Sequence, residues 1–142
     1  MATTIASITL SSADIADNGI SISSTATLTN AGNDTGMTKT TGLTRITTAA
    51  TDNIVLINSA DATAGTMGAV ATITKGKVYI KNLNARGDGS KFVNILIAAV
   101  EVGRLYGNDW AFFPFEGGSG NDVELTPSST TDTDLEFIVF YE

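Results

Sequence analysis

Short apolar runs, separated by clusters of Gly, Asn, Asp and Pro, dominate the chain from residue 39 onward. The runs are rich in Val, Ile, Phe and Tyr, which favour β-strands, and the separating residues are those that turns require. The pattern predicts about eight strands and no amphipathic helix. We therefore expect an all-β protein, an antiparallel β-sandwich or jelly roll with an N-terminal extended arm. The clearest predicted strands are Lys77–Asn82, Val100–Tyr106, Trp110–Phe115 and Leu135–Tyr141.

Two of these strands, 110–115 and 135–141, are apolar on both faces, because side chains alternate between faces along a strand. A two-layer sandwich needs only one apolar face on each strand. Several aromatic side chains left together in water would favour aggregation. We therefore expect the second faces to meet the N-terminal segment, another subunit or a partner surface. The candidate interface residues of these strands are Trp110, Phe112, Phe113, Phe115, Ile138 and Phe140.

The dipeptide Ala98–Ala99 lies between two further apolar runs, 92–97 and 100–106. A two-residue hairpin turn of the primed type favours Gly or Asn, because its central residues take positive φ. Alanine at both positions therefore favours one bent, continuous strand over residues 92–105 rather than a hairpin. Two more strands are predicted over 43–48 and 53–58.

The first 34 residues are rich in Ser and Thr and poor in charge. Residues 20–29 alternate apolar and hydroxyl side chains with a period of two, directly after the turn sequence Asp17-Asn18-Gly19,. We interpret residues 1–34 as an N-terminal arm and residues 35–142 as the sandwich domain. Ile20 and Ile22 are the candidate interface residues of an arm strand that pairs with a neighbouring chain. The alternatives are a disordered leader and an ordinary first hairpin of the domain.

Composition narrows the functions that we expect. Charged residues make up 16% of the 142 residues and the net charge is −7. A negative chain lacks the basic surface that binds phosphate backbones, so we expect no nucleic-acid partner. No apolar stretch approaches the roughly 20 residues of a membrane helix, and the N-terminus does not resemble a signal peptide. We therefore expect no membrane partner either.

The chain contains no His and no Cys, which excludes the usual nucleophile–histidine arrangements and the usual zinc ligands. We expect no catalytic residues, no cofactor and no metal site. Oxygen atoms of Asn121, Asp122, Asp132 and Asp134 could supply part of the roughly six to eight ligands of calcium, but without the spacing of an EF-hand. The tripeptide Arg86–Asp88 matches an integrin-binding sequence, although an exposed turn favours the same residues.

One ordered set of motifs is familiar. Its members are Lys77-Val-Tyr-Ile-Lys-Asn-Leu, the segment 100–115 with Gly-Arg-Leu and Phe-Phe-Pro-Phe, and Asp134-Leu-Glu-Phe-Ile-Val-Phe. Together they resemble the C-terminal β domain of small virion proteins of tailed bacteriophages. The resemblance covers about residues 75–142, and it departs from the pattern at Ala98–Ala99, where a Gly-rich turn is expected.

The resemblance implies a virion structural protein, a capsid decoration or cement protein located on the capsid surface and synthesised in the host cytoplasm. Its partners would be the major capsid protein and further copies of the chain, with a trimer favoured. In this hypothesis the two-sided strands bury apolar area between subunits, and the arm adds a strand to a partner's sheet. The alternative is a carbohydrate- or receptor-binding β module of a phage fibre or tail, with Tyr79, Tyr106 and Trp110 as its exposed aromatic residues.

Overall fold

The structure is a computed structural model that describes residues 3–13, 20–29, 39–50, 52–57, 75–116, 122–128 and 131–141. In these residues the secondary structure consists of β-strands, and every strand pair is antiparallel. The described part of the chain contains no helix long and apolar enough to span a membrane. Contacts divide the chain into two compact units, Met1–Thr38 and Lys39–Glu142.

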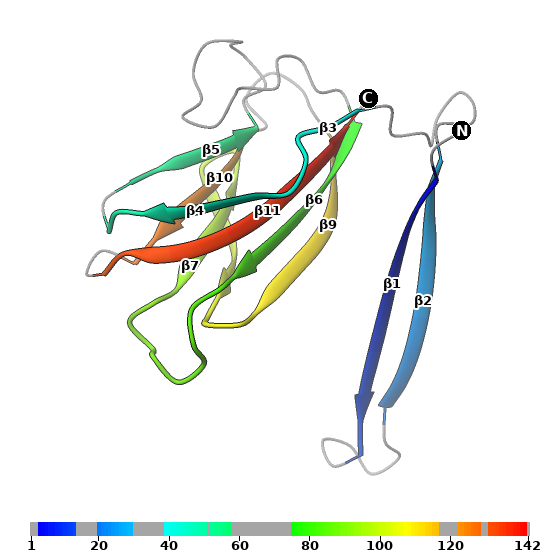
Figure 1. Ribbon diagram of the computed structural model, residues 1–142, viewed down its shortest axis with the longest axis horizontal. Helices are drawn as coiled ribbons and strands as arrows, with labels where there is room; N and C mark the ends of the chain where they lie inside the picture. The colour runs from blue at the N-terminus through cyan, green and yellow to red at the C-terminus, as the bar shows by residue number, and fades with distance from the viewer. Residues whose placement is uncertain are drawn as a thin grey trace. The chain divides into compact units, whose positions relative to one another are not determined.

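The first unit contains a two-stranded ribbon of β1 (Thr3–Ser12) and β2 (Ile20–Thr29), visible in Figure 1. The strands pair without a bulge from Thr3 opposite Thr29 to Ser12 opposite Ile20. The strand predicted over residues 20–29 is confirmed, and it forms a hairpin with β1, as in the alternative of a first hairpin, although the hairpin belongs to a unit of its own. Whether this unit also pairs with a neighbouring chain stays a prediction.

The second unit is a sandwich of two antiparallel sheets, which form its two layers in Figure 1. The first sheet has the order β3-β11-β6-β9, and β4 pairs with β11 beside β3. Its strands are β3 (Lys39–Thr40), β4 (Thr44–Thr48), β6 (Lys75–Asn82), β9 (Trp110–Glu116) and β11 (Thr133–Tyr141). The second sheet has the order β5-β10-β7-β8. Its strands are β5 (Ile54–Ile57), β7 (Val93–Ile97), β8 (Val100–Leu105) and β10 (Val123–Pro127).

The order of these strands is that of a jelly roll. β3 and β4 pair with successive parts of β11 and share one edge of the first sheet. From β4 to β11 the chain changes sheet at every connection except the β7–β8 hairpin. If β3 and β4 are counted as one edge strand, each sheet has four strands. Alternation of the chain between two such sheets gives the double Greek key of a jelly roll. The predicted all-β antiparallel sandwich is therefore confirmed.

The core lies between the two sheets and consists of inward-facing aliphatic and aromatic side chains. On β6 and β11 every second residue is buried, as the period of two requires,. The buried apolar residues are Ile54, Leu56, Ile57, Val78, Ile80, Val93, Ile95, Leu105, Phe115, Val123, Leu125, Leu135, Phe137 and Val139.

A buried amide, that of Asn82, joins both sheets at one end of the core. Its Nδ2 donates to the carbonyl oxygens of Lys91 and Leu105, at 3.0 and 3.1 Å. Its Oδ1 accepts from the backbone N–H and the side-chain Nδ2 of Asn84, at 3.0 and 2.8 Å. Asn82 is fully buried, so these bonds replace water for every polar atom of its side chain.

The expectation of one continuous strand over residues 92–105 is wrong. Ile97 and Val100 face each other across a two-residue turn between β7 and β8. Ala98 and Ala99 take φ values of 51° and 61° there, the positive φ at both central residues that a type I′ turn requires. The N–H of Ala98 also donates to the carbonyl oxygen of Asp122 at 2.9 Å. Pairing of β7 with β8 thus overrides the local preference of alanine for negative φ.

Candidate functional site

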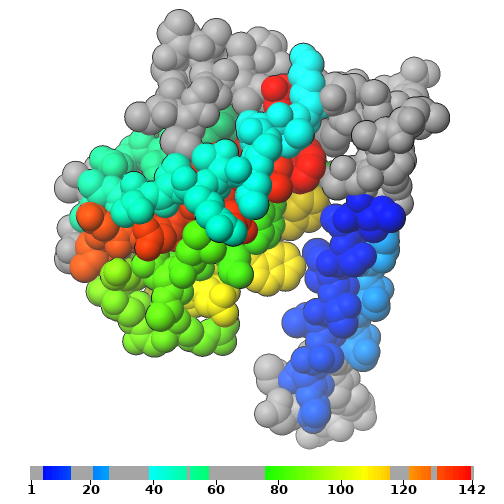
Figure 2. Space-filling view, viewed as in Figure 1, coloured from blue at the N-terminus to red at the C-terminus, as the bar shows by residue number. Residues whose placement is uncertain are grey.

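The outer side of the first sheet carries an apolar surface, which we call the outer aromatic face. Because residues alternate along each strand, its members point away from the core. Figure 2 shows the sandwich from this side, with β3 and β4 in cyan, β11 in red, β6 in green and β9 in yellow. The outer aromatic face consists of Tyr79 on β6, Trp110, Phe112 and Pro114 on β9, and Ile138 and Phe140 on β11.

These side chains form ordered rows across three strands. Ile138, Tyr79 and Phe112 are direct neighbours in the register of β11, β6 and β9. Trp110 is 49% exposed, and the three members of this row are half-buried. Neighbouring aromatic and β-branched side chains on one sheet face stabilise each other, so the row also contributes to the stability of the free protein.

A lysine of β6 occupies the middle position of each of the two neighbouring rows. Lys81 lies between Glu136 and Trp110, and Lys77 lies between Phe140 and Pro114. Both lysines are half-buried. A lysine in such a position covers apolar surface with its methylene groups and keeps its ammonium group in water. A partner can therefore exclude water from the apolar side chains of this face while both ammonium groups stay solvated.

A polar chain across three strands borders the face. The Arg45 Nε donates to Glu136 Oε2 at 2.7 Å, and the Tyr79 hydroxyl donates to Glu136 Oε1 at 3.3 Å. Glu136 is 8% exposed. The pKa of Tyr79 is raised, first by burial, then by the Glu136 charge and the hydrogen bond to it. Tyr79 therefore stays neutral and donates, which fixes its ring on the outer face.

The outer side of the second sheet mixes paired polar groups with apolar residues: Val55 and Leu96 lie opposite Glu124, and β8 exposes Val100 and Val102. Arg104 Nε donates to Asn94 Oδ1 at 2.7 Å, and Asn53 Nδ2 donates to Glu124 Oε2 at 3.3 Å. The Arg104 guanidinium also lies over the Phe92 ring, 4.1 Å from its centroid. Polar groups that are paired within one sheet suit a solvated surface. None of the four strands of the second sheet contains an aromatic residue, so the aromatic side chains of the outer face distinguish the first sheet from the second.

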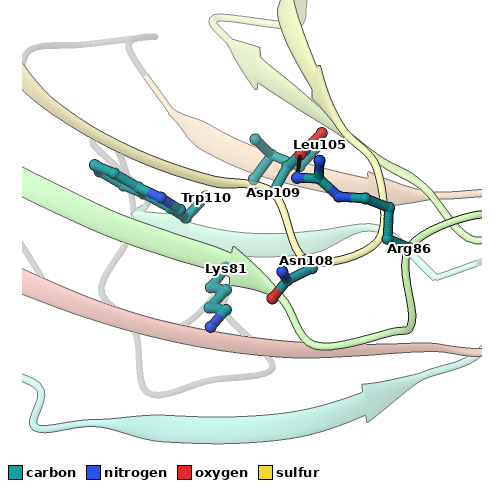
Figure 3. Close-up of a pocket in the computed structure, with 6 residues that line it drawn as sticks. All are labelled: Lys81, Arg86, Leu105, Asn108, Asp109 and Trp110. Atoms are coloured by element: carbon teal, nitrogen blue, oxygen red, sulfur yellow. Dashed lines mark hydrogen bonds and ion pairs between the residues drawn. The ribbon is translucent and has the colours of Figure 1, made fainter. Parts of the chain in front are cut away.

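A hollow of about 490 Å³ opens beside Trp110. Arg86 reaches toward Asp109 on one side of it, with Nη2 3.4 Å from Oδ1, and the Trp110 ring lies farther along β9 (Figure 3). Asp109 Oδ2 also accepts from the backbone N–H of Tyr106 at 3.1 Å. An indole beside charged and amide groups is suited to binding a ring with polar substituents. The hollow is lined by Lys81, Arg86, Leu105, Asn108, Asp109 and Trp110.

The structure separates the predicted interface residues into three groups. Four of them share the outer aromatic face: Trp110, Phe112, Ile138 and Phe140. Phe113 and Phe115 are corrected: both point inward, Phe115 as part of the core and Phe113 packed against it. Strand alternation places them there, so they contribute to the sandwich and not to an interface. Ile22 is 52% exposed on the hairpin, and the side chain of Ile20 lies outside the described residues.

The three aromatic residues considered for sugar binding do not all share a surface. Tyr79 and Trp110 lie on the outer aromatic face. Tyr106 instead packs edge-on against Phe92, with ring centroids 6.0 Å apart. A sugar site would therefore be built on Trp110 and the hollow rather than on a row of all three.

Several of the remaining chemical candidates have hydrogen-bond or ion-pair partners within the chain. In the part of the chain that the structure describes, no three acidic side chains come together in a way that could hold a metal ion. Asp134 Oδ1 accepts from Thr47 Oγ1 at 2.6 Å, and Asn121 lies outside the described residues. In the exposed tripeptide, Arg86 pairs with Asp109 and Asp88 accepts from Ser90, whose two hydrogen bonds lower the pKa of Asp88.

Comparison with known proteins adds no relative: no family model matches the chain, and neither the curated sequences nor the solved structures gave a match. The resemblance to tailed-phage virion proteins thus depends on the motifs within residues 75–142. Sequence reasoning also missed the bond between Arg45 and Glu136, which are 91 residues apart. Only the pairing of β4 with β11 makes them neighbours.

Proposed function

We propose that the protein is a virion structural protein that binds the outer surface of a viral capsid and stabilises the shell. The observation that carries this proposal is the outer aromatic face, in which Ile138, Tyr79 and Phe112 form a row across three strands of one sheet and Trp110 lies exposed on the same face. Aromatic residues are enriched at protein–protein interfaces, and tryptophan and tyrosine are among the residues that contribute most of the binding energy there. A decoration protein needs one such face, because it binds from one side only.

The proposed mechanism is the removal of aromatic surface from water. Complete burial of a side chain such as Phe112 or Ile138 contributes about 1.5–3 kcal/mol. Trp110, half exposed in the free protein, has the most surface still to bury. Arg45 and Glu136 at the border would orient the contact more than strengthen it. Many copies that bind neighbouring capsid subunits then stabilise the shell together.

Co-sedimentation with capsids that lack decoration, from the phage whose genome encodes the chain, tests this proposal. Phe112→Lys should weaken binding at least about 100-fold, equivalent to about 2.7 kcal/mol. Thr126→Lys is the matched control, because Thr126 is also half-buried and lies on the outer side of β10. Its binding should equal that of the unchanged protein.

Two results would contradict the proposal in different ways. If the unchanged protein does not sediment with capsids, the decoration function is wrong. If Phe112→Lys binds as well as the unchanged protein, the outer aromatic face is not the binding surface. Thermal unfolding of both variants must match that of the unchanged protein within a few degrees, so that misfolding is not read as lost binding.

A second candidate function is carbohydrate binding, favoured by the hollow beside Trp110. Trp110 is the single tryptophan of the chain, so its fluorescence reports directly on this hollow. Glycans that bind the protein on a glycan array should shift the Trp110 emission when they are titrated in solution. Asp109→Ala should abolish this shift. If no glycan on the array binds and the Trp110 emission stays constant, carbohydrate binding is wrong as a function.

A further inference from the structure

The hollow beside Trp110 is built on a fixed backbone, that of the turn between β8 and β9. The N–H of Asn108 donates to the carbonyl oxygen of Asn82 at 2.9 Å, and the N–H of Asn82 donates to that of Asp109 at 3.0 Å. The N–H of Asp109 donates to the carbonyl oxygen of Tyr106 at 2.9 Å, and the carboxylate of Asp109 accepts from the N–H of Tyr106 at 3.1 Å. A site whose backbone is held before a ligand arrives loses less conformational entropy on binding.

The same turn lies close against the loop that follows β6. A Cβ atom on Gly107 would collide with the carbonyl oxygen of Ala85, so this approach requires glycine,. Asn108 follows with a φ of 67°, a conformation that asparagine adopts more readily than most residues. In Figure 3 the Asn108 side chain lies on the side of the hollow where Lys81 lies. The turn thus presents the Asn108 amide to the hollow from a backbone that is fixed on both sides.

Three polar groups that line the hollow have no partner in the part of the chain that the structure describes. The Lys81 ammonium forms no ion pair there, since its neighbour in the register, Glu136, is bound by Arg45. The Asn108 amide and the indole N–H of Trp110 form no hydrogen bond with another described residue. Exposed groups of this kind bind water, which the polar atoms of a ligand can replace.

The charge of the hollow is opposite to that of the chain. The whole chain has a net charge of −7, whereas the lining of the hollow combines two cations, Lys81 and Arg86, with one carboxylate, Asp109. Arg86 Nη2 lies 3.4 Å from Asp109 Oδ1, and the Arg86 side chain is 74% exposed. Most donors of its guanidinium therefore remain available. The hollow attracts a negatively charged ligand.

Trp110 adds an aromatic surface to these charges. Its side chain is 49% exposed, and an indole ring packs against the apolar face of a flat or cyclic ligand. The volume of about 490 Å³ lies within the roughly 300–1,000 Å³ of small-ligand sites. Asp109 can accept hydrogen bonds from hydroxyl groups, and its charge repels a doubly charged phosphate more than a singly charged carboxylate. Hydroxyl groups, one carboxylate and a ring are the features of an acidic sugar.

We propose that the hollow binds acidic sugars, with the ring against Trp110, the sugar carboxylate paired with Lys81, and ring hydroxyl groups on Asn108 and Asp109, a proposal that rests on carbohydrate binding, the second candidate function, and not on capsid binding. Arg86 adds positive charge at the rim. A carboxylate and an ammonium group form a charge-assisted hydrogen bond, so Lys81 distinguishes acidic from neutral sugars.

The first test is isothermal titration calorimetry of the full-length protein at low ionic strength. The probes are tri-galacturonate, tri-mannuronate and sialyllactose, each compared with its methyl ester, which keeps the ring and removes the charge. At least one acid should bind at least about fivefold more tightly than its ester, as expected for one accessible ion pair. About 0.5 M salt should reduce this ratio below about twofold, because salt screens exposed charges.

The second test changes the lysine. Lys81→Gln should bring the affinities of the acid and its ester within about twofold of each other and leave that of the ester unchanged, because only the ion pair is lost. Lys77→Gln is the matched control: Lys77 is also half-buried on β6, but it lies opposite Pro114 instead of Trp110. It should keep the preference for the acid. Trp110→Ala should weaken the acid and the ester alike, since both place their rings on the indole.

Three results would overturn the proposal: no binding of any of the three acids, equal affinity of every acid and its ester, or a preference for the acid that survives Lys81→Gln. Equal affinity would leave carbohydrate binding itself in place, with neutral sugars as the ligands. Failure of capsid co-sedimentation would change none of these outcomes, so capsid binding and acidic-sugar binding can fail separately.

Discussion

The sandwich and the hairpin consist of the same kind of strand, yet they differ in what becomes of their apolar faces. Val78 and Val139 in the sandwich are fully buried, whereas Leu10 and Ile22 in the hairpin are half exposed. Alternation with a period of two decides which side chains share a face. Burial requires a second layer, which the sandwich provides with its other sheet.

The largest expected effect concerns the buried amide at the end of the sandwich. Asn82→Ala should lower the free energy of unfolding by roughly 3–5 kcal/mol, because it leaves the carbonyl groups of Lys91 and Leu105 and the N–H of Asn84 without a partner,. Denaturant unfolding followed by Trp110 fluorescence measures it.

Asn53→Ala is the control for this prediction. Asn53 is exposed, and its side-chain Nδ2 donates to Glu124 Oε2 at 3.3 Å. Loss of this exposed hydrogen bond should lower the free energy of unfolding by less than about 0.5 kcal/mol. Equal effects of the two substitutions would mean that the end of the sandwich is open to water. The conclusion that Asn82 is buried in the core of the sandwich would then be wrong.

The next effect has the opposite sign. Replacing Ala98 by Asn and Ala99 by Gly should raise the free energy of unfolding by about 1–2 kcal/mol. Alanine is strained at the positive φ of both positions, whereas asparagine and glycine adopt positive φ readily. The control Ala111→Gly, on β9, should destabilise instead, since glycine weakens a strand interior. A destabilised double variant would show that the turn has another conformation in solution.

This turn also shows where sequence reasoning reached its limit. Alternation and turn residues were enough to predict most strands and the two-sided character of β9 and β11. Local preference failed at Ala98–Ala99, because pairing of β7 with β8 over several residues outweighs the strain of two alanines. The contacts of Asn82 and of Arg45 with Glu136 join residues distant in sequence, so no local pattern contains them. β1 has the alternation of a strand, but its small Ala and Ser residues weaken the signal.

A smaller effect concerns the border of the outer aromatic face. The pKa of Tyr79 is raised by burial and by Glu136, so the folded protein keeps a proton that the unfolded chain releases near pH 10. The stability that this provides is complete below pH 10 and is lost as the pH rises through the folded pKa. Tyr79→Phe should cost less than about 1 kcal/mol at pH 7, since the pair is partly solvated, and should remove this loss at high pH.

Unfolding free energies between pH 7 and pH 11 check that expectation. Glu136→Gln supplies the control, because it removes the charge and keeps the shape of the side chain. It should bring the pKa of Tyr79 part of the way back, since burial remains. A pKa unchanged by Glu136→Gln would mean that burial alone acts on the phenol.

The smallest expected effect returns to the two units. A variant that lacks residues 1–38 should unfold with a free energy within about 0.5 kcal/mol of the value for the sandwich in the full chain, because the described core residues all belong to the second unit. A loss of more than about 1 kcal/mol would mean that the hairpin covers part of the sandwich, and the outer aromatic face would be the surface to examine.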